Sequence, residues 1–125
     1  EQKYFIEPAA SLIKSGLVQQ YAEYYGLNVL SRNNVFLTSG KLPVDVFGRA
    51  FTIINLFPFA KSAFNKYLAG NDITNGNISC RNFPVKPEGI KKIFKLADGG
   101  DDYFFFTTDD KKTKLVYHCR KIHDE

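Results

Sequence analysis

Two histidines, His118 and His123, are the side chains of this chain best suited to proton transfer or to binding a transition metal. Positions five residues apart in a β-strand point to opposite faces of a sheet, so these two are poor partners for one metal ion. His118 and Cys119 also point in opposite directions, which argues against a nucleophilic Cys–His pair. The sequence therefore predicts surface histidines with no catalytic or metal-binding role.

Aspartates form two clusters, one at each end of a predicted strand. Asp98, Asp101 and Asp102 precede the strand, and Asp109 and Asp110 follow it. A strand of this length spans about 20 Å, so the two clusters cannot act as one pair of carboxylates. The first cluster offers oxygen ligands of the kind that Ca²⁺ prefers, but it lacks the spacing of an EF-hand loop. We therefore expect solvated turns and no metal site.

The sequence patterns of common catalytic and nucleotide-binding sites do not occur in the 125 residues. Gly99 and Gly100 match neither the Walker nor the dinucleotide-binding pattern, and there is no Gly-x-Ser-x-Gly motif. The sequence thus predicts no catalytic residue, no cofactor and no enzymatic activity. An enzyme that uses scattered carboxylates, for example Asp98 and Asp102, is the remaining alternative.

Basic side chains gather in the last third of the chain, although the whole chain is only mildly basic. It has seventeen Lys and Arg against thirteen Asp and Glu, and its net charge is +4. Because Tyr103, Phe105 and Tyr117 lie nearby in the sequence, the lysines could form a face that binds a polyanion such as DNA or a glycan. Lysines that protect a sheet edge are the alternative. The candidate polyanion-binding residues are Lys86, Lys91, Lys92, Lys95, Lys111, Lys112, Lys114, Arg120 and Lys121.

The two cysteines, Cys80 and Cys119, both lie in predicted strands and could form one disulfide. Such a bridge would close a loop of about 39 residues and stabilise the fold by roughly 4 kcal/mol. It would also place the protein in an oxidising, extracytoplasmic compartment: the periplasm, the cell surface or the secreted fraction. Two free buried thiols are the alternative. Asn77-Ile-Ser79 forms an N-glycosylation sequon, which matters only in a eukaryotic secreted protein.

The elements that carry these residues begin with an amphipathic helix predicted over 8–25. Pro8 suits a first helical turn, and Gly26 suits the position after the last one. Apolar residues recur between them close to the helical period. The next segments are short strands over 28–30 and 35–38, a segment over 44–57 that fits either a strand or a helix, and a second short helix over 58–68.

The C-terminal half reads as an antiparallel sheet. Gly99 and Gly100 favour a hairpin turn, because glycine adopts the positive φ that such turns need. Three adjacent phenylalanines, Phe104–Phe106, indicate a sheet that is covered on both faces. The predicted strands cover 78–83, 91–97, 103–108 and 113–122, and the last three form a meander, with a helical turn as the alternative for 91–97. The fold class is therefore α+β: one domain over 1–125 with the N-terminal helix packed on a C-terminal antiparallel sheet.

The chain begins at Glu1 and contains no methionine, so we expect a preceding segment to be missing. No apolar stretch approaches the roughly 20 residues of a membrane span. Contact with a membrane is therefore expected only through such a preceding segment.

This order of elements resembles the soluble domain of a type IV pilin or minor pilin. The predicted helix has the tyrosine-rich end Val18–Gly26, a connecting region follows, and antiparallel strands fill the C-terminal half. The last strand carries Cys119, which could pair with Cys80 as in many pilins. The resemblance implies a non-enzymatic structural or assembly subunit of a pilus-like surface filament, with other subunits as partners. Basic minor pilins in some systems help to capture DNA, and the lysines would then be candidates for that role.

An alternative function is a secreted or surface-exposed binding module that serves adhesion. Its partner would be a host protein, a glycan or a polyanion such as DNA. A cleavable signal sequence before Glu1 would favour this alternative, and an apolar helix before Glu1 would favour the pilin-like subunit.

Overall fold

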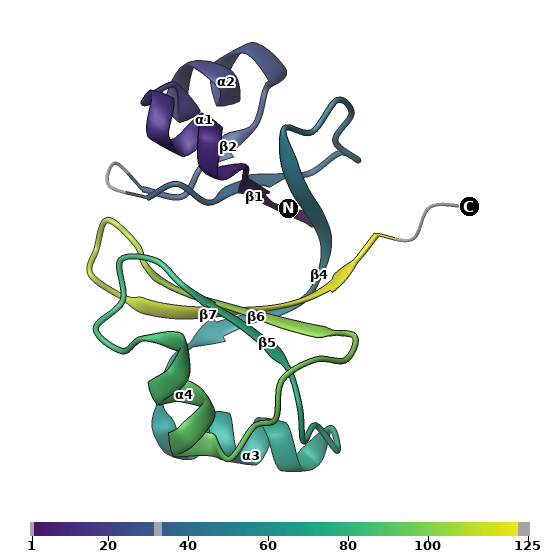
Figure 1. Cartoon of the computed structure of the whole chain (residues 1–125), viewed down its shortest axis with the longest axis vertical. Coiled ribbons are helices and arrows are strands. Elements are labelled where there is room, and N and C mark those ends of the chain that lie inside the picture. Colours follow the sequence, from purple (N-terminus) through teal and green to yellow (C-terminus); the bar gives the residue numbers. More distant parts are fainter. Residues whose placement is uncertain (1, 32–33, 123–125) are drawn as a thin grey trace.

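The computed structural model describes residues 2–31 and 34–122, and it arranges them around one mixed sheet (Figure 1). The described strands number seven and have the order β2-β3-β1-β4-β7-β6-β5. In chain order the elements are β1 Tyr4–Pro8, α1 Ala10–Ser15, α2 Val18–Tyr25, β2 Asn28–Val29, β3 Leu37–Ser39, β4 Gly48–Pro58, α3 Lys61–Gly70, β5 Asn77–Cys80, α4 Pro87–Phe94, β6 Asp102–Thr108 and β7 Lys114–Lys121.

The long strand β4 joins the two halves of the sheet. Its first part pairs with β1, and its second part pairs with β7 across a β-bulge between Ile53 and Asn55. Because bulges sharpen the bend and twist of a strand, the two halves of the sheet can face each other. Figure 1 shows α1 and α2 beyond β1, and α3 and α4 on the far side of β5 and β6. The result is a layered fold with helices on both outer sides.

Side chains that point alternately to the two faces of the strands explain how the layers pack against one another. Phe5 of β1 points inward and stacks on Phe105 of β6, with ring centroids 4.3 Å apart, although β4 and β7 lie between these strands in the sheet. The next residue, Ile6, points the other way and packs on α2. Phe104 and Phe106 likewise point to α3 and α4. All three consecutive phenylalanines are buried, which confirms the expectation of a sheet covered on both faces.

The predicted fold class is wrong, because the sheet is mixed and runs through both halves of the chain. The N-terminal half contributes β2 and β3, which overlap the short strands predicted over 28–30 and 35–38, and β1, which was not predicted. The predicted helix over 8–25 is split into α1 and α2 at Gly16, whose φ of 75° ends the first of them. The ambiguous segment over 44–57 contains most of strand β4, and the predicted short helix over 58–68 overlaps α3.

The predicted C-terminal meander is also wrong. Residues 91–97 belong largely to helix α4, which begins at Pro87 and is capped by Lys95 in a left-handed conformation. Strand β5 is therefore followed by a helix, and it pairs with β6 in parallel. Among the residues that the structure describes, no helix is long and apolar enough to cross a membrane.

Candidate functional site

The nine basic residues predicted to bind a polyanion do not form a single patch. The group at residues 111–114 and the group at residues 120–121 lie at opposite ends of β7, whose eight residues span roughly 24 Å. Every one of the nine is exposed except Lys91, which is partly buried. Lys86, Lys91, Lys92 and Lys95 lie on or beside α4, Lys111, Lys112 and Lys114 lie at the turn between β6 and β7, and Arg120 and Lys121 end β7.

Two of these basic side chains are engaged in ion pairs. The Lys91 ammonium lies 2.7 Å from Oδ1 of Asp98, and Arg120 Nε lies 3.3 Å from Oδ1 of Asp102. Within 2–31 and 34–122 the other seven side chains make no ion pair. They therefore remain available to an external anion, and their role in binding stays a prediction.

The turn between β6 and β7 borders a small groove, here called the turn groove. Its volume is about 390 Å³, and Lys112 and Lys114 line it together with Asn82 and Asp110. Asp109 also lies there, and its Oδ1 accepts hydrogen bonds from the backbone N–H groups of residues 111 and 113. This aspartate therefore holds the turn in shape, and the groove presents the ammonium groups of Lys112 and Lys114, which make no ion pair with the residues that the structure describes.

His118 is buried, contrary to the prediction of a surface histidine. It is 3% exposed, and its ring stacks on Phe104 with centroids 4.6 Å apart. Both ring nitrogens have partners: Nε2 lies 2.6 Å from Oδ1 of Asp102, and Nδ1 lies 2.6 Å from the hydroxyl of Tyr67. His123 lies outside the described residues.

The polar chain Asp102–His118–Tyr67 has a geometry that resembles a catalytic triad, but its chemistry is that of a structural network. Burial raises the pKa of Tyr67, so its phenol stays protonated and donates its hydrogen to Nδ1. We assign the His118 tautomer accordingly, with Nε2–H donating to the Asp102 carboxylate. The His118 ring is 3% exposed, so it is closed to a substrate in solution. The chain therefore joins α3 to strands β6 and β7.

The predicted disulfide is absent, because Cys80 and Cys119 are free thiols on opposite faces of the sheet. Cys80 lies in β5 and faces α3 and α4, whereas Cys119 lies in β7 and faces β1. Strand β6 separates the two. Burial raises the pKa of both thiols, which makes them poor nucleophiles.

A groove that sequence reasoning missed lies where β1 ends and β4 begins. This arginine groove has a volume of about 480 Å³ and is lined by Arg49 and Arg81, together with Glu7 and Gly48. The two arginines are isolated in the sequence, each without a basic neighbour. No local cluster therefore signalled them; only the fold brings them together.

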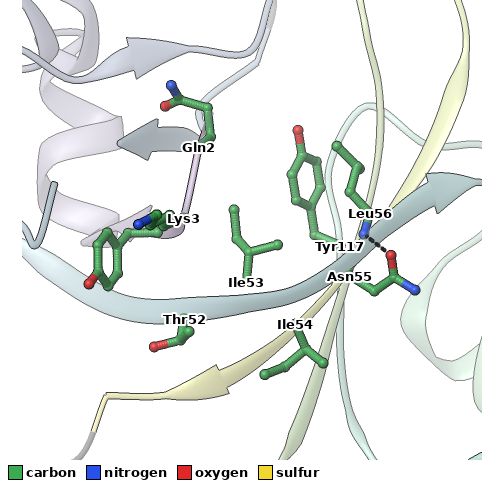
Figure 2. A pocket seen from close by; sticks show the side chains of 9 residues that line it. Gln2, Lys3, Thr52, Ile53, Ile54, Asn55, Leu56 and Tyr117 are labelled. Atoms are coloured by element: carbon green, nitrogen blue, oxygen red, sulfur yellow. Dashed lines mark hydrogen bonds between the residues drawn. The ribbon is translucent and has the colours of Figure 1, made fainter. Parts of the chain in front are cut away.

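Two further grooves are more apolar. The β4 groove, of about 620 Å³, follows β4 beyond its last contact with β1, and Lys3 is the single charged residue among those that line it. Figure 2 shows Ile53, Leu56 and the Tyr117 ring on the side of β4 where Gln2 lies, whereas Ile54 points away. The α2 groove, of about 470 Å³, is lined by residues 25–27 and 39–44. Neither groove offers a convergent set of charged groups.

Comparisons with known proteins point away from a surface filament. Residues 48–121 match the THUMP domain-like family, and they are more than half of the chain. A crystal structure of a protein assigned as a methyltransferase, from Porphyromonas gingivalis, is 33% identical with a TM-score of 0.88, and covers 97% of this chain and 30% of that one. An uncharacterized S-adenosylmethionine-dependent methyltransferase, found in two strains of Mycobacterium tuberculosis, is 22% identical over 94 residues, which are 75% of this chain and 26% of the relative. The chain thus spans less than a third of these relatives.

These matches overturn the pilin resemblance and what it implied. A structural subunit of a filament, pilus subunits or a surface receptor as partners, and a role in adhesion are all wrong, because the family and the relatives belong to a different class of protein. The prediction of a non-enzyme is overturned as well, since the relatives are described as methyltransferases. The single domain over 1–125 and the extracytoplasmic location stay predictions.

The range that the family matches begins and ends at strand boundaries of the fold. Residues 48–121 run from the start of β4 to the end of β7, and they include α3, α4 and all nine predicted polyanion-binding residues. This chain belongs to the THUMP domain-like family.

Proposed function

We propose that the chain is the RNA-binding part of a longer S-adenosylmethionine-dependent methyltransferase, and that it holds the RNA substrate for methyl transfer. THUMP domains bind RNA, and the relatives of this chain are described as methyltransferases. The observation that carries the proposal is the distribution of charge. Residues 48–121 contain thirteen Lys and Arg against seven Asp and Glu, whereas the rest of the chain contains four against six.

This asymmetry is what binding to a nucleic-acid backbone requires. Exposed lysines that contact phosphates release condensed counterions, and the free energy of this release supplies most of the sequence-independent affinity. Lys92 of α4 and the lysines at the turn between β6 and β7 are suited to this role, because they make no ion pair with the described residues. We expect such contacts to position RNA and to carry no sequence information.

The described residues do not fit S-adenosylmethionine, whose ribose hydroxyls and adenine ring call for a free carboxylate beside an apolar wall. The β4 and α2 grooves lack a carboxylate. Glu7 of the arginine groove is already bonded to Arg49 and Ser79, and the turn groove has a polar lining. The proposal therefore assigns the methyl donor to the part of the longer protein outside this chain.

The test is a titration of the chain with a fluorescently labelled RNA hairpin at several salt concentrations. A variant with Lys92→Gln, Lys95→Gln and Lys114→Gln should bind about a hundredfold more weakly, with a salt dependence that is shallower by roughly two to three counterions. The control carries Lys3→Gln, Lys14→Gln and Lys41→Gln and so loses the same charge from the segment before residue 48. If both variants weaken binding equally, or if the unaltered chain does not bind RNA, the proposal is wrong.

A further inference from the structure

The arginine groove lies between three elements of the fold that are far apart in the sequence. Glu7 stands near the end of β1, Arg49 near the start of β4, and Arg81 directly after β5. Arg81 is fixed at its backbone, because its N–H donates to the carbonyl of Phe106 at 3.0 Å. Two arginines and one glutamate therefore line the groove, which leaves it with an excess positive charge.

Arg49 is held in one orientation before any ligand arrives. Its Nε and Nη2 both donate to Oε1 of Glu7, the former at 2.8 Å, and the hydroxyl of Ser79 donates to the other carboxylate oxygen at 3.4 Å. The guanidinium carbon also lies 5.4 Å from the centroid of the Phe51 ring and 5.7 Å from that of Tyr103. An arginine has five N–H donors, so several remain for another acceptor. A guanidinium fixed in this way loses little side-chain entropy on binding an anion.

Arg81 supplies the charge that Glu7 does not neutralise. Its side chain is exposed and makes no hydrogen bond or ion pair with the residues that the structure describes. Arginine presents its donors in a planar fork that matches phosphate oxygens. A second arginine without a partner, beside one that is preorganised, is suited to an anion that carries several acceptor oxygens.

Gly48 explains why the groove has this shape. A Cβ atom at this position would lie 2.2 Å from the carbonyl oxygen of Glu7, and the φ of Gly48 is 149°. Only glycine allows β4 to start so close to the end of β1. This close approach is what brings Arg49 beside Glu7.

The arginine groove continues into the basic region of the proposed RNA interface. Arg81 lines the arginine groove, while its neighbour Asn82 lines the turn groove together with Lys112 and Lys114. Because Arg81 and Asn82 are adjacent in the sequence, they connect the arginine groove to Lys112 and Lys114 of the turn groove, where Asp109 and Asp110 also lie. A nucleic-acid backbone carries its phosphates in such a row, whereas a single small anion would occupy one groove.

We propose that Arg49 and Arg81 bind one backbone phosphate of the RNA, and that the strand continues past Asn82 towards Lys112 and Lys114. This inference rests on the proposed function and names a phosphodiester subsite within it. Glu7 is a positioning residue here, since it orients Arg49 and touches no phosphate itself.

The experiment uses the same labelled RNA hairpin and compares single variants of the whole chain. Arg81→Gln should weaken binding about tenfold and lower the salt slope by about one, and Arg81→Lys should recover part of the loss. Glu7→Gln keeps an acceptor for Arg49 but removes the negative charge, so it should tighten binding several-fold. Lys41→Gln removes one charge before residue 48 and is the matched control, with little change expected.

The outcomes separate this inference from the proposed function. If the unaltered chain binds RNA but Arg81→Gln and Lys41→Gln weaken it equally, RNA binding stands and the phosphate subsite is overturned. A Glu7→Gln variant that binds RNA more weakly while unfolding at the same urea concentration also contradicts the subsite. If the unaltered chain binds no RNA, both proposals fail together.

Discussion

His118 is the residue whose environment differs most from its expected one. Its partners Asp102 and Tyr67 lie 16 and 51 positions away in the sequence, so no local pattern could place them around the ring. Once both ring nitrogens are bonded, burial of the imidazole becomes tolerable. The histidine therefore serves to join α3 to the sheet.

This network predicts a clear order of mutational effects. Tyr67→Phe removes one hydrogen bond and should lower the free energy of unfolding by about 1 kcal/mol. His118→Phe removes the hydrogen-bond partner of the buried phenol and one of the two partners of the Asp102 carboxylate, which keeps Arg120, and should cost about 3 kcal/mol. In the His118→Phe background the phenol has lost its acceptor, so Tyr67→Phe should then cost much less. Urea unfolding of the unaltered protein, the two single variants and the double variant measures this. Additive effects would show that Asp102, His118 and Tyr67 do not form a coupled network.

The titration of Cys80 and Tyr117 gives a prediction for alkaline pH. Burial raises the pKa of the Cys80 thiol from 9.0 to about 12 and that of the Tyr117 phenol from 10.0 to about 12. Above pH 9 the unfolded chain therefore loses these protons first, and the stability present at lower pH is lost as the pH rises towards 12. Urea midpoints measured between pH 8 and about pH 11 should fall, and Cys80→Ala should flatten the first part of this fall. A flat profile in the unaltered chain would contradict the assigned burial.

At the scale of elements, the order of strands determines whether the two cysteines can form a disulfide. Strands β5 and β7 are separated by β6, and Cys80 lies level with Phe106 whereas Cys119 lies level with Tyr103, so two strand spacings and a three-residue offset place the cysteines roughly 14 Å apart. A disulfide requires Cα atoms closer than about 7 Å. We predict that the denatured, non-reduced chain takes up two alkyl groups on treatment with iodoacetamide. Uptake of none would demonstrate a bridge and a different pairing of the strands.

Packing of α3 on the sheet gives a second prediction at this scale. Phe64 is completely buried and meets the rings of Phe94, Phe104 and Phe106 edge-on. Phe64→Ala should lower the free energy of unfolding by about 3–5 kcal/mol, because it removes a large ring and leaves a cavity. Lys61→Ala, on the exposed side of the same helix, is the control and should change stability little. Equal effects of the two substitutions in urea unfolding would mean that α3 does not pack as described.

Elements with strong local signals could be predicted from the sequence, and elements defined by distant partners could not. Strand β6 and the helix beginning near Pro58 have clear apolar patterns. Helix α4 was read as a strand because its eight residues are too few for periodicity to decide, although Pro87 marks its first turn. Strand β1 is only five residues long, and its place between β3 and β4 depends on pairing alone.

The residues of the candidate site also fall into those that the sequence reveals and those that only the fold brings together. The lysines form local clusters in the sequence, so they could be found as a possible polyanion-binding set. Arg49 and Arg81 are separated by 32 positions and line one groove only because the start of β4 lies near the ends of β1 and β5. The nature of the polyanion could not be read from charge, since DNA, RNA and glycans all attract lysines.

At the scale of the whole molecule, the two parts of the chain differ in charge although they share one sheet. The family-matched residues 48–121 hold the entire positive excess. The bend along β4 places β1 against the inner face of β6 and β7, while α4 and the turn between β6 and β7 stay exposed. We therefore expect the RNA contacts to lie among the residues after position 48.

The most direct test of RNA binding is to map the contact on the isotope-labelled chain by NMR while an RNA hairpin is added. The account predicts that backbone amide signals shift in α4, in the turn between β6 and β7, and at Arg81 and Asn82, and that added salt reverses these shifts. Shifts confined to residues before position 48, or no shifts at low salt, would contradict it.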